Sequence, residues 1–97
     1  MFSSRAFKLV YNIIEDRKDK RPKGSYIISL FNEGGDRIAQ KVGEEAIEVI
    51  VAAKNESKQR IISEVADLFF HTLILLSSKN IKLSDILKEL KQRQHRH

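Results

Sequence analysis

A chain of 97 residues is long enough for one small domain and too short for two. Hydrophobic residues make up 41% and charged residues 32%, which excludes a disordered chain and is typical of a soluble globular protein. The absence of cysteine excludes disulfides and thiolate metal sites and favours the cytoplasm, while a net charge of +5 fits either simple solubility or a phosphate-rich partner.

Apolar residues recur at helical spacing along the whole chain, and no stretch alternates as a strand would. We therefore predict one all-α domain over residues 1–97, a small bundle of about five helices with a central antiparallel pair. The tail over about 91–97 is polar and expected to be flexible. The expected helices run, in chain order, from Ser3 or Ser4 to a loop at 17–24, from a Ser25 cap to Asn32, from an Asp36 cap to about Lys54, from the connection 55–57 to about Ser78, and from a Ser84 cap onward.

The fourth predicted helix carries apolar residues around most of its circumference, and its polar residues fall within an arc of about 100°. A chain this small has too few other helices to cover it, so we predict that homodimerisation completes the bundle. Its most apolar part, residues 65–76, is interrupted by Asp67 and His71 and is too short to cross a bilayer. The N-terminus shows no signal-peptide pattern, so we expect a cytoplasmic protein without a membrane partner.

Two acidic clusters lie on the third and fourth predicted helices: Glu44-Glu45-x-x-Glu48 and Glu64-x-x-Asp67. An antiparallel turn near Glu56 would place Glu48 beside Glu64, each eight residues from the turn. The same turn would place Glu45 beside Asp67, each eleven residues away. Carboxylates held this close repel one another, and a hard divalent cation relieves the repulsion. The two clusters therefore predict a metal site.

The alternative interpretation of the clusters is two solvated helix faces with ordinary ion pairs. Lys41 stands four residues before Glu45, and Arg60 stands four residues before Glu64, so local pairs are available. The matched register about the turn, and an aspartate in mid-helix where its propensity is poor, favour the metal site. His71, one turn after that aspartate, is interpreted as a satisfied interior or surface group rather than a ligand.

Three stretches of the chain resemble the phosphoribosyl-ATP pyrophosphohydrolases of histidine biosynthesis, within the all-α (MazG-like) nucleoside triphosphate pyrophosphohydrolases. They are residues 22–26 (PKGSY), 36–46 (DRIAQKVGEEA) and 64–68 (EVADL). The resemblance covers about residues 5–92, and Ile27 stands where the family commonly has threonine. It implies a helical bundle, dimeric or larger, that uses magnesium, or manganese, to cleave phosphoribosyl-ATP between its α- and β-phosphates.

The resemblance also implies roles for individual residues. The expected metal ligands are Glu45, Glu48, Glu64 and Asp67. Glu44 would orient the attacking water or act as its base. The residues expected to bind substrate are the phosphate-clamping Arg37, Lys41 and Lys54, and the nucleotide-bordering Ser25 and Tyr26.

Two other functions fit parts of the sequence. A house-cleaning MazG-like pyrophosphatase acting on free nucleoside triphosphates would share the acidic signature, but the block at residues 36–46 favours the biosynthetic enzyme. A basic helical module for nucleic acid would need its cations on one face. Here the cations are dispersed along the chain, so we expect a small nucleotide as substrate and no nucleic-acid partner.

Overall fold

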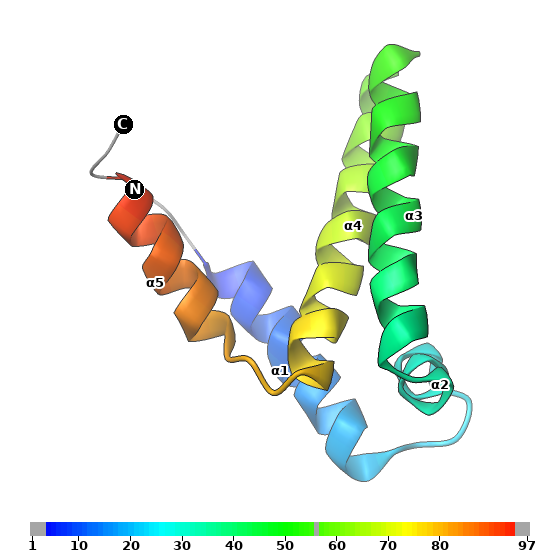
Figure 1. Ribbon diagram of the computed structural model, residues 1–97, viewed down its shortest axis with the longest axis vertical. Coiled ribbons are helices and arrows are strands. Elements are labelled where there is room, and N and C mark those ends of the chain that lie inside the picture. Colours follow the sequence, from blue (N-terminus) through cyan, green and yellow to red (C-terminus); the bar gives the residue numbers. More distant parts are fainter. Residues whose placement is uncertain (1–3, 56, 95–97) are drawn as a thin grey trace.

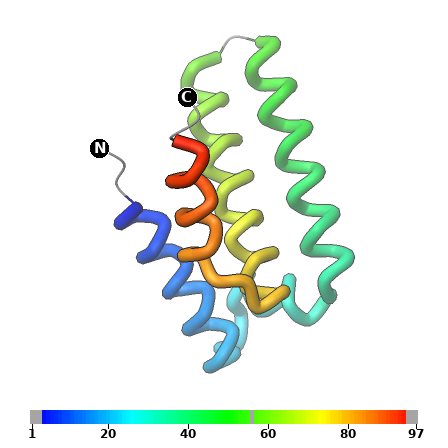
Figure 2. The backbone as a smooth tube through the Cα atoms, turned by 60° about the vertical axis from the view of Figure 1, so that its left-hand side comes forward, coloured from blue at the N-terminus to red at the C-terminus, as the bar shows by residue number. Residues whose placement is uncertain are grey.

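The computed structural model describes residues 4–55 and 57–94, and within these ranges the chain is all-helical, as predicted. The helices are α1 (Arg5–Lys20), α2 (Tyr26–Glu33), α3 (Gly35–Lys54), α4 (Lys58–Ser78) and α5 (Leu83–Gln94). The two longest, α3 and α4, run antiparallel and form the central pair (Figure 1). Figure 2 shows α2 near the lower end of this pair and α1 on the side of α4 that faces away from α3. Glu56, about which the register was counted, lies outside the described residues.

Serine caps set the starts of two helices. The Ser25 hydroxyl accepts a hydrogen bond from the Ile28 amide at 3.4 Å, as predicted for the start of α2. The Ser57 hydroxyl does the same for the Arg60 amide at 3.3 Å at the start of α4. Each cap satisfies an amide that has no partner within its own helix, so the connections before α2 and α4 are locally encoded.

Two predicted caps were wrong. Helix α3 begins at Gly35 with Gly34 in the cap position, so Asp36 lies in the first turn, where its charge still favours the helix dipole. Gly34 ends α2 and starts α3 with φ 99°, a conformation that glycine adopts without strain. Helix α5 begins at Leu83, one residue before the expected Ser84 cap, and Leu83 is buried in the core cluster. It continues to Gln94, so the first part of the expected flexible tail is helical, and residues 95–97 lie outside the described part.

The hydrophobic core lies at one end of the molecule, where α1, α2, the start of α3 and the end of α4 meet (Figure 1). Ile14, Ile38 and Ile74 are almost completely buried there. Full burial of such a side chain contributes about 1.5–3 kcal/mol. Ile27, the departure from the family pattern, is also buried in this cluster. The core therefore fixes α2 and the lower ends of α3 and α4 relative to one another.

A polar cluster around the buried Ser77 ties α1 to the end of α4. Ser77 is fully buried, and its hydroxyl donates to the Glu15 carboxylate. The Lys18 amine donates to the Ser77 carbonyl at 2.8 Å and to the Asn80 side-chain oxygen at 2.9 Å. A positive charge at a helix C-terminus also opposes the negative end of the helix dipole. These contacts hold α1 in place although much of its own apolar face is exposed.

The opposite end of the α3–α4 pair extends beyond the other helices as an arm (Figure 1). Ile47, Ile50 and Ile62 on this arm are 58%, 55% and 54% exposed. Phe69, which is 47% exposed, lies nearer the core and packs against Phe7 of α1 with ring centroids 5.5 Å apart. The radius of gyration is 14.6 Å, against about 12.5 Å for a compact domain of this length. The accessible surface is 7229 Å², whereas a folded monomer of this mass exposes about 5,700 Å². The single chain thus leaves an unusually large apolar surface uncovered.

Helix α4 satisfies the length and composition of a membrane span, with a mean hydropathy of 1.5 over its most apolar window. Core helices of soluble proteins share this length and composition. The window is longer than the segment 65–76 considered from the sequence. It also contains Glu64, Asp67 and His71, whose side chains face polar partners described below.

Candidate metal centre and nucleotide site

Three carboxylates converge between α3 and α4. Glu45 comes from the middle of α3, and Glu64 and Asp67 come from successive turns of α4. One oxygen of each lies within 4.8 Å of the others. The Glu45 and Glu64 side chains are only 13% and 16% exposed, whereas Asp67 is exposed. We call these three residues the acidic cluster.

The acidic cluster fits a hard divalent cation. Its donors are all carboxylate oxygens, which suit magnesium, calcium or manganese and disfavour softer metals. Magnesium holds its ligands at about 2.1 Å, so neighbouring donor oxygens lie about 3–4 Å apart. Small side-chain adjustments from the observed separation reach that spacing. The antiparallel register that brings Glu45 to Asp67 is the one expected from the sequence.

Glu48, the fourth predicted ligand, lies outside the acidic cluster. Its side chain is half exposed, and its carboxylate is 3.9 Å from the Arg60 guanidinium. The same guanidinium nitrogen is 3.2 Å from Glu64. Arg60 therefore stands between the two glutamates that were expected to meet. The positive charge of Arg60 offsets part of the repulsion between the two glutamates, which a metal ion would otherwise relieve.

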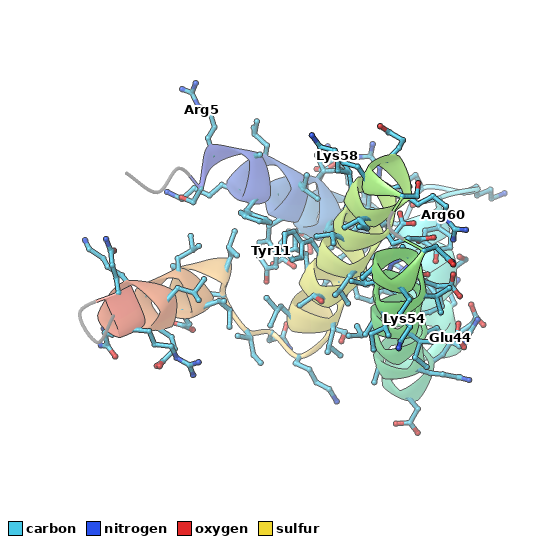
Figure 3. The ribbon with its side chains drawn as sticks, turned by 90° about the horizontal axis from the view of Figure 1, so that it is seen from above. Arg5, Tyr11, Glu44, Lys54, Lys58 and Arg60 are labelled. Carbon is cyan, nitrogen blue, oxygen red and sulfur yellow. The ribbon has the colours of Figure 1, made fainter. Side chains whose placement is uncertain are left out.

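The predicted phosphate clamp is also engaged with glutamates. Arg37 donates to Glu44 at 3.1 Å, and the Lys41 amine is 3.3 Å from Glu45 and 3.7 Å from Glu44. Burial lowers the pKa of Lys41, but its bond to Glu45 and the nearby charges of Tyr26, Glu45 and Glu44 outweigh that effect and raise it overall. Lys41 is therefore a permanent cation at the edge of the acidic cluster. Figure 3 shows Glu44 and Arg60 on the same side of the α3–α4 pair, with Tyr11 on the other.

Tyr26 is joined to the acidic cluster through His71. The ring of His71 is buried, and its Nδ1 donates to the Asp67 carbonyl at 2.7 Å. A carbonyl can only accept, so in the neutral ring Nε2 accepts from the Tyr26 hydroxyl, also at 2.7 Å. Phe70 stacks on the Tyr26 ring with centroids 6.5 Å apart. His71 is thus a satisfied buried group, as interpreted from the sequence, and it fixes Tyr26 at the edge of the site.

The remaining two predicted site residues lie at different distances from the acidic cluster. Ser25 is the residue before Tyr26 and caps α2, so it borders the same region. Lys54 is exposed and lies nine residues beyond Glu45 on α3, which is about 14 Å along the helix axis. Within the described residues Lys54 makes no ion pair with the acidic groups.

Sequence reasoning anticipated the convergence of Glu45 with Asp67 and the local pairs of Lys41 and Arg60. It missed the bond between Tyr26 and His71, since the two residues are separated by 45 positions and no periodic pattern connects them. It also missed the bridging position of Arg60. The only available signal was that Arg60 is close in sequence to the turn between the helices and has a long side chain.

The chain matches a known family over nearly its whole length. The profile of the family described as phosphoribosyl-ATP pyrophosphohydrolase matches residues 7–94. The chain belongs to this family. Proteins named phosphoribosyl-ATP pyrophosphatase from Clostridium botulinum and Clostridium acetobutylicum are 54% and 52% identical to it over 87 residues, covering 90% of this chain and 79% of each relative. One from Bacillus cereus is 47% identical over 88 residues, covering 91% of this chain and 82% of the relative.

The residues matched to the phosphoribosyl-ATP pyrophosphohydrolase family include every acidic and basic site residue discussed above. The resemblance drawn from residues 22–26, 36–46 and 64–68 is therefore confirmed. The family match also covers α1 and α5, which contribute no residue to the acidic cluster.

Proposed function

We propose that this protein hydrolyses phosphoribosyl-ATP to phosphoribosyl-AMP and pyrophosphate in histidine biosynthesis, and that it depends on magnesium. The proposal is supported by relatives of that name at about half identity. The observation that carries it is the acidic cluster, because three oxygen ligands from two helices suit the ion that accompanies a nucleotide triphosphate.

In this proposal Glu45, Glu64 and Asp67 hold magnesium, and manganese is an acceptable substitute. When bound, the ion neutralises charge on the phosphates and lowers the pKa of a coordinated water. Glu48 joins as a fourth ligand only by giving up its contact with Arg60, which is long at 3.9 Å and half exposed. An exposed pair of this kind contributes little stability, so its loss is a small cost.

Arg37 and Lys41 bind the substrate phosphates. Lys41 is already held next to the acidic cluster by its pair with Glu45, and Arg37 is held by its pair with Glu44, the residue before Glu45. Fixed cations beside developing negative charge stabilise the transition state without reorganisation. Lys41 lies nearer to the cluster and stays protonated across the physiological range because its pKa is raised. Lys54 remains an outlying candidate for the same role.

Glu44 acts on the attacking water. The water oxygen bonds to a phosphorus of the α–β anhydride, the bridging bond breaks, and the water proton passes to Glu44 as pyrophosphate leaves. Arg37 and Lys41 hold the Glu44 carboxylate in place through contacts of 3.1 and 3.7 Å.

The direct test is to incubate the protein and magnesium separately with phosphoribosyl-ATP, dATP and dUTP and to follow pyrophosphate release. We expect the highest kcat/KM with phosphoribosyl-ATP. Faster release from dATP or dUTP would instead assign the protein to house-cleaning of free nucleotides. Release that persists in excess chelator would remove the metal from the proposal.

We further infer that the active form is a cytoplasmic homodimer. The accessible surface exceeds that of a typical monomer of this mass by about 1,500 Å², roughly twice what one partner buries in a standard interface. The exposed apolar residues of the α3–α4 arm supply such an interface. A second copy of the chain covers them in the same way that helices cover one another within a bundle.

A further inference from the structure

The loop between α1 and α2 and the first turns of α2 form a pocket of about 720 Å³. This volume falls in the range of about 300–1,000 Å³ usual for small-molecule sites. Its lining comes from one continuous stretch of chain: Arg21, Pro22, Lys23, Gly24, Ser25, Tyr26, Ile28, Ser29 and Asn32. We call it the loop pocket. None of the functional assignments made so far uses its two cations.

The loop pocket is cationic. Arg21 and Lys23 line it, and none of the described residues that line it carries a carboxylate. Ten ion pairs join side chains in the described part of the chain, and neither of these cations takes part in one. By contrast, Arg37, Lys41 and Arg60 at the acidic cluster are all paired with glutamates. The pocket therefore keeps its positive charge available for an anion.

The position of Arg21 is set by the fold. Its backbone adopts the left-handed conformation with φ 49°, and its amide donates to the Arg17 carbonyl at 2.8 Å, which ends α1. Its guanidinium donates to the side-chain oxygen of Asn32 in α2. This bond uses one of the five guanidinium donors, so the others remain able to bind a phosphate.

The loop pocket adjoins the acidic cluster through a single side chain. Tyr26 lines the pocket, and its hydroxyl bonds to His71, which in turn bonds to the Asp67 carbonyl. Tyr26 also lies close enough to Lys41 to influence its pKa. A ligand that spans both places would therefore pass along the Tyr26 ring.

We propose that the loop pocket binds the 5′-phosphate of the phosphoribosyl group, at the end of the substrate away from the triphosphate. Arg21 and Lys23 supply the charge, and Tyr26 lies against the nucleoside between the two anionic ends. This inference rests on the proposed function, because the adenine of phosphoribosyl-ATP carries two ribose groups, one with the triphosphate and the other with a 5′-phosphate. An ordinary nucleoside triphosphate has no group to fill the pocket. The loop pocket thus accounts for a preference for phosphoribosyl-ATP over free nucleotides, which the acidic cluster alone does not provide.

The test compares KM and kcat for phosphoribosyl-ATP in Arg21→Asn, Lys23→Ala and the double variant. Asparagine tolerates the left-handed backbone at position 21, so the loop shape is kept while the charge is removed. We expect KM to rise about ten- to a hundredfold in the double variant, as for loss of charge-assisted hydrogen bonds, with kcat within about twofold of wild type. Lys88→Ala, which removes an exposed cation on α5 far from the pocket, is the matched control and should change neither.

A second measurement uses ribose 5-phosphate as a competitor and ribose as its uncharged counterpart. We expect ribose 5-phosphate to inhibit the wild type competitively, the double variant to lose that inhibition, and ribose to have no effect on either. Unchanged KM in the double variant, or a loss confined to kcat, would overturn the proposal. Wild-type protein that releases no pyrophosphate from phosphoribosyl-ATP would instead overturn the proposed function. Binding of ribose 5-phosphate followed by NMR would still test the loop pocket in that case.

Discussion

Replacing Asp67 with asparagine separates two effects of the acidic cluster: the repulsion that destabilises the metal-free protein and the binding of magnesium that stabilises it. Within the described residues Glu45 is paired with Lys41 and Glu64 with Arg60, while Asp67 takes part in no ion pair. Asparagine has nearly the same shape and a similar helix propensity. The Asp67 backbone carbonyl, which accepts from His71, is not altered by the substitution. The change therefore removes one uncompensated charge and little else.

The size of the effect follows from the cluster geometry. Two unit charges at the observed limit of 4.8 Å repel by about 0.9 kcal/mol in water and about 3.5 kcal/mol at an effective dielectric constant of 20. Asp67 is exposed, and Lys41 and Arg60 offset most of the charge on its neighbours. We therefore expect the metal-free variant to gain about 1 kcal/mol of unfolding free energy, which corresponds to about 4–8 °C in Tm for a domain of this size.

Magnesium should reverse the order of stability. A ligand present at a hundred times its Kd stabilises the folded state by about 2.7 kcal/mol, and only the wild type keeps the full ligand set. Scanning calorimetry at one protein concentration, in chelator and in magnesium, measures both effects. Asp19→Asn, which removes an exposed aspartate of α1, is the control and should shift stability by less than about 0.5 kcal/mol in either condition. A variant that melts lower than wild type in chelator, or equal stabilisation of both proteins by magnesium, would refute the argument.

Three further outcomes are expected. Lys41→Ala and Arg37→Ala should each lower kcat/KM about ten- to a thousandfold, with the larger effect for Lys41. Magnesium affinity measured by calorimetry should be unchanged or higher, and a parallel loss of metal binding would instead make these cations structural partners of the glutamates. Light scattering at micromolar concentration should give at least twice the monomer mass of 11.2 kDa, and Ile50→Asp on the arm should shift it towards the monomer; wild type at the monomer mass would contradict the dimer. Burial, and secondarily Glu15, raises the pKa of Tyr11, so its contribution to stability is complete below pH 10 and falls as pH rises further. Tyr11→Phe removes the hydroxyl that donates to the Ile81 carbonyl at 2.6 Å, so its unfolding free energy at pH 8 should be lower by about 1 kcal/mol and should decline less steeply towards pH 10.5 in urea titrations; equal slopes would exclude this origin.

The fold was predictable because its signals are local. Ser25 lies at the start of α2 and the connection 55–57 lies before α4, and both capping serines bond to amides three residues ahead. The predicted Asp36 cap was wrong because Gly34 takes the cap position with a positive φ and no side-chain hydrogen bond. The conformational freedom of glycine is sufficient to turn the chain there. The Ser84 cap predicted for α5 was also wrong: the helix includes Leu83, whose burial in the core depends on the tertiary structure and has no local sequence signal.

The candidate site was predictable only as far as helix register determines it. The three-residue step from Glu64 to Asp67 and the antiparallel turn suffice to bring Glu45 to them. The position of Glu48 was not settled by register, because Arg60 has a long side chain whose conformation depends on which glutamates are within reach. The contact of Tyr26 with His71 depends on how α2 packs below α4, which no spacing along the chain encodes.

The uneven burial along α4 has a consequence for how the molecule opens. Its fully packed residues, His71, Leu73, Ile74 and Ser77, all belong to the half that meets the core, whereas Glu64 lies in the half that forms the arm. In the isolated chain, backbone amides near the tip of the arm should exchange with solvent through local fraying, long before amides around Ile74 do so through global unfolding. Because Glu64 lies on the arm side of α4, while the Asp67 carbonyl is tied to the buried His71, binding of an ion between them should order the adjoining part of the arm.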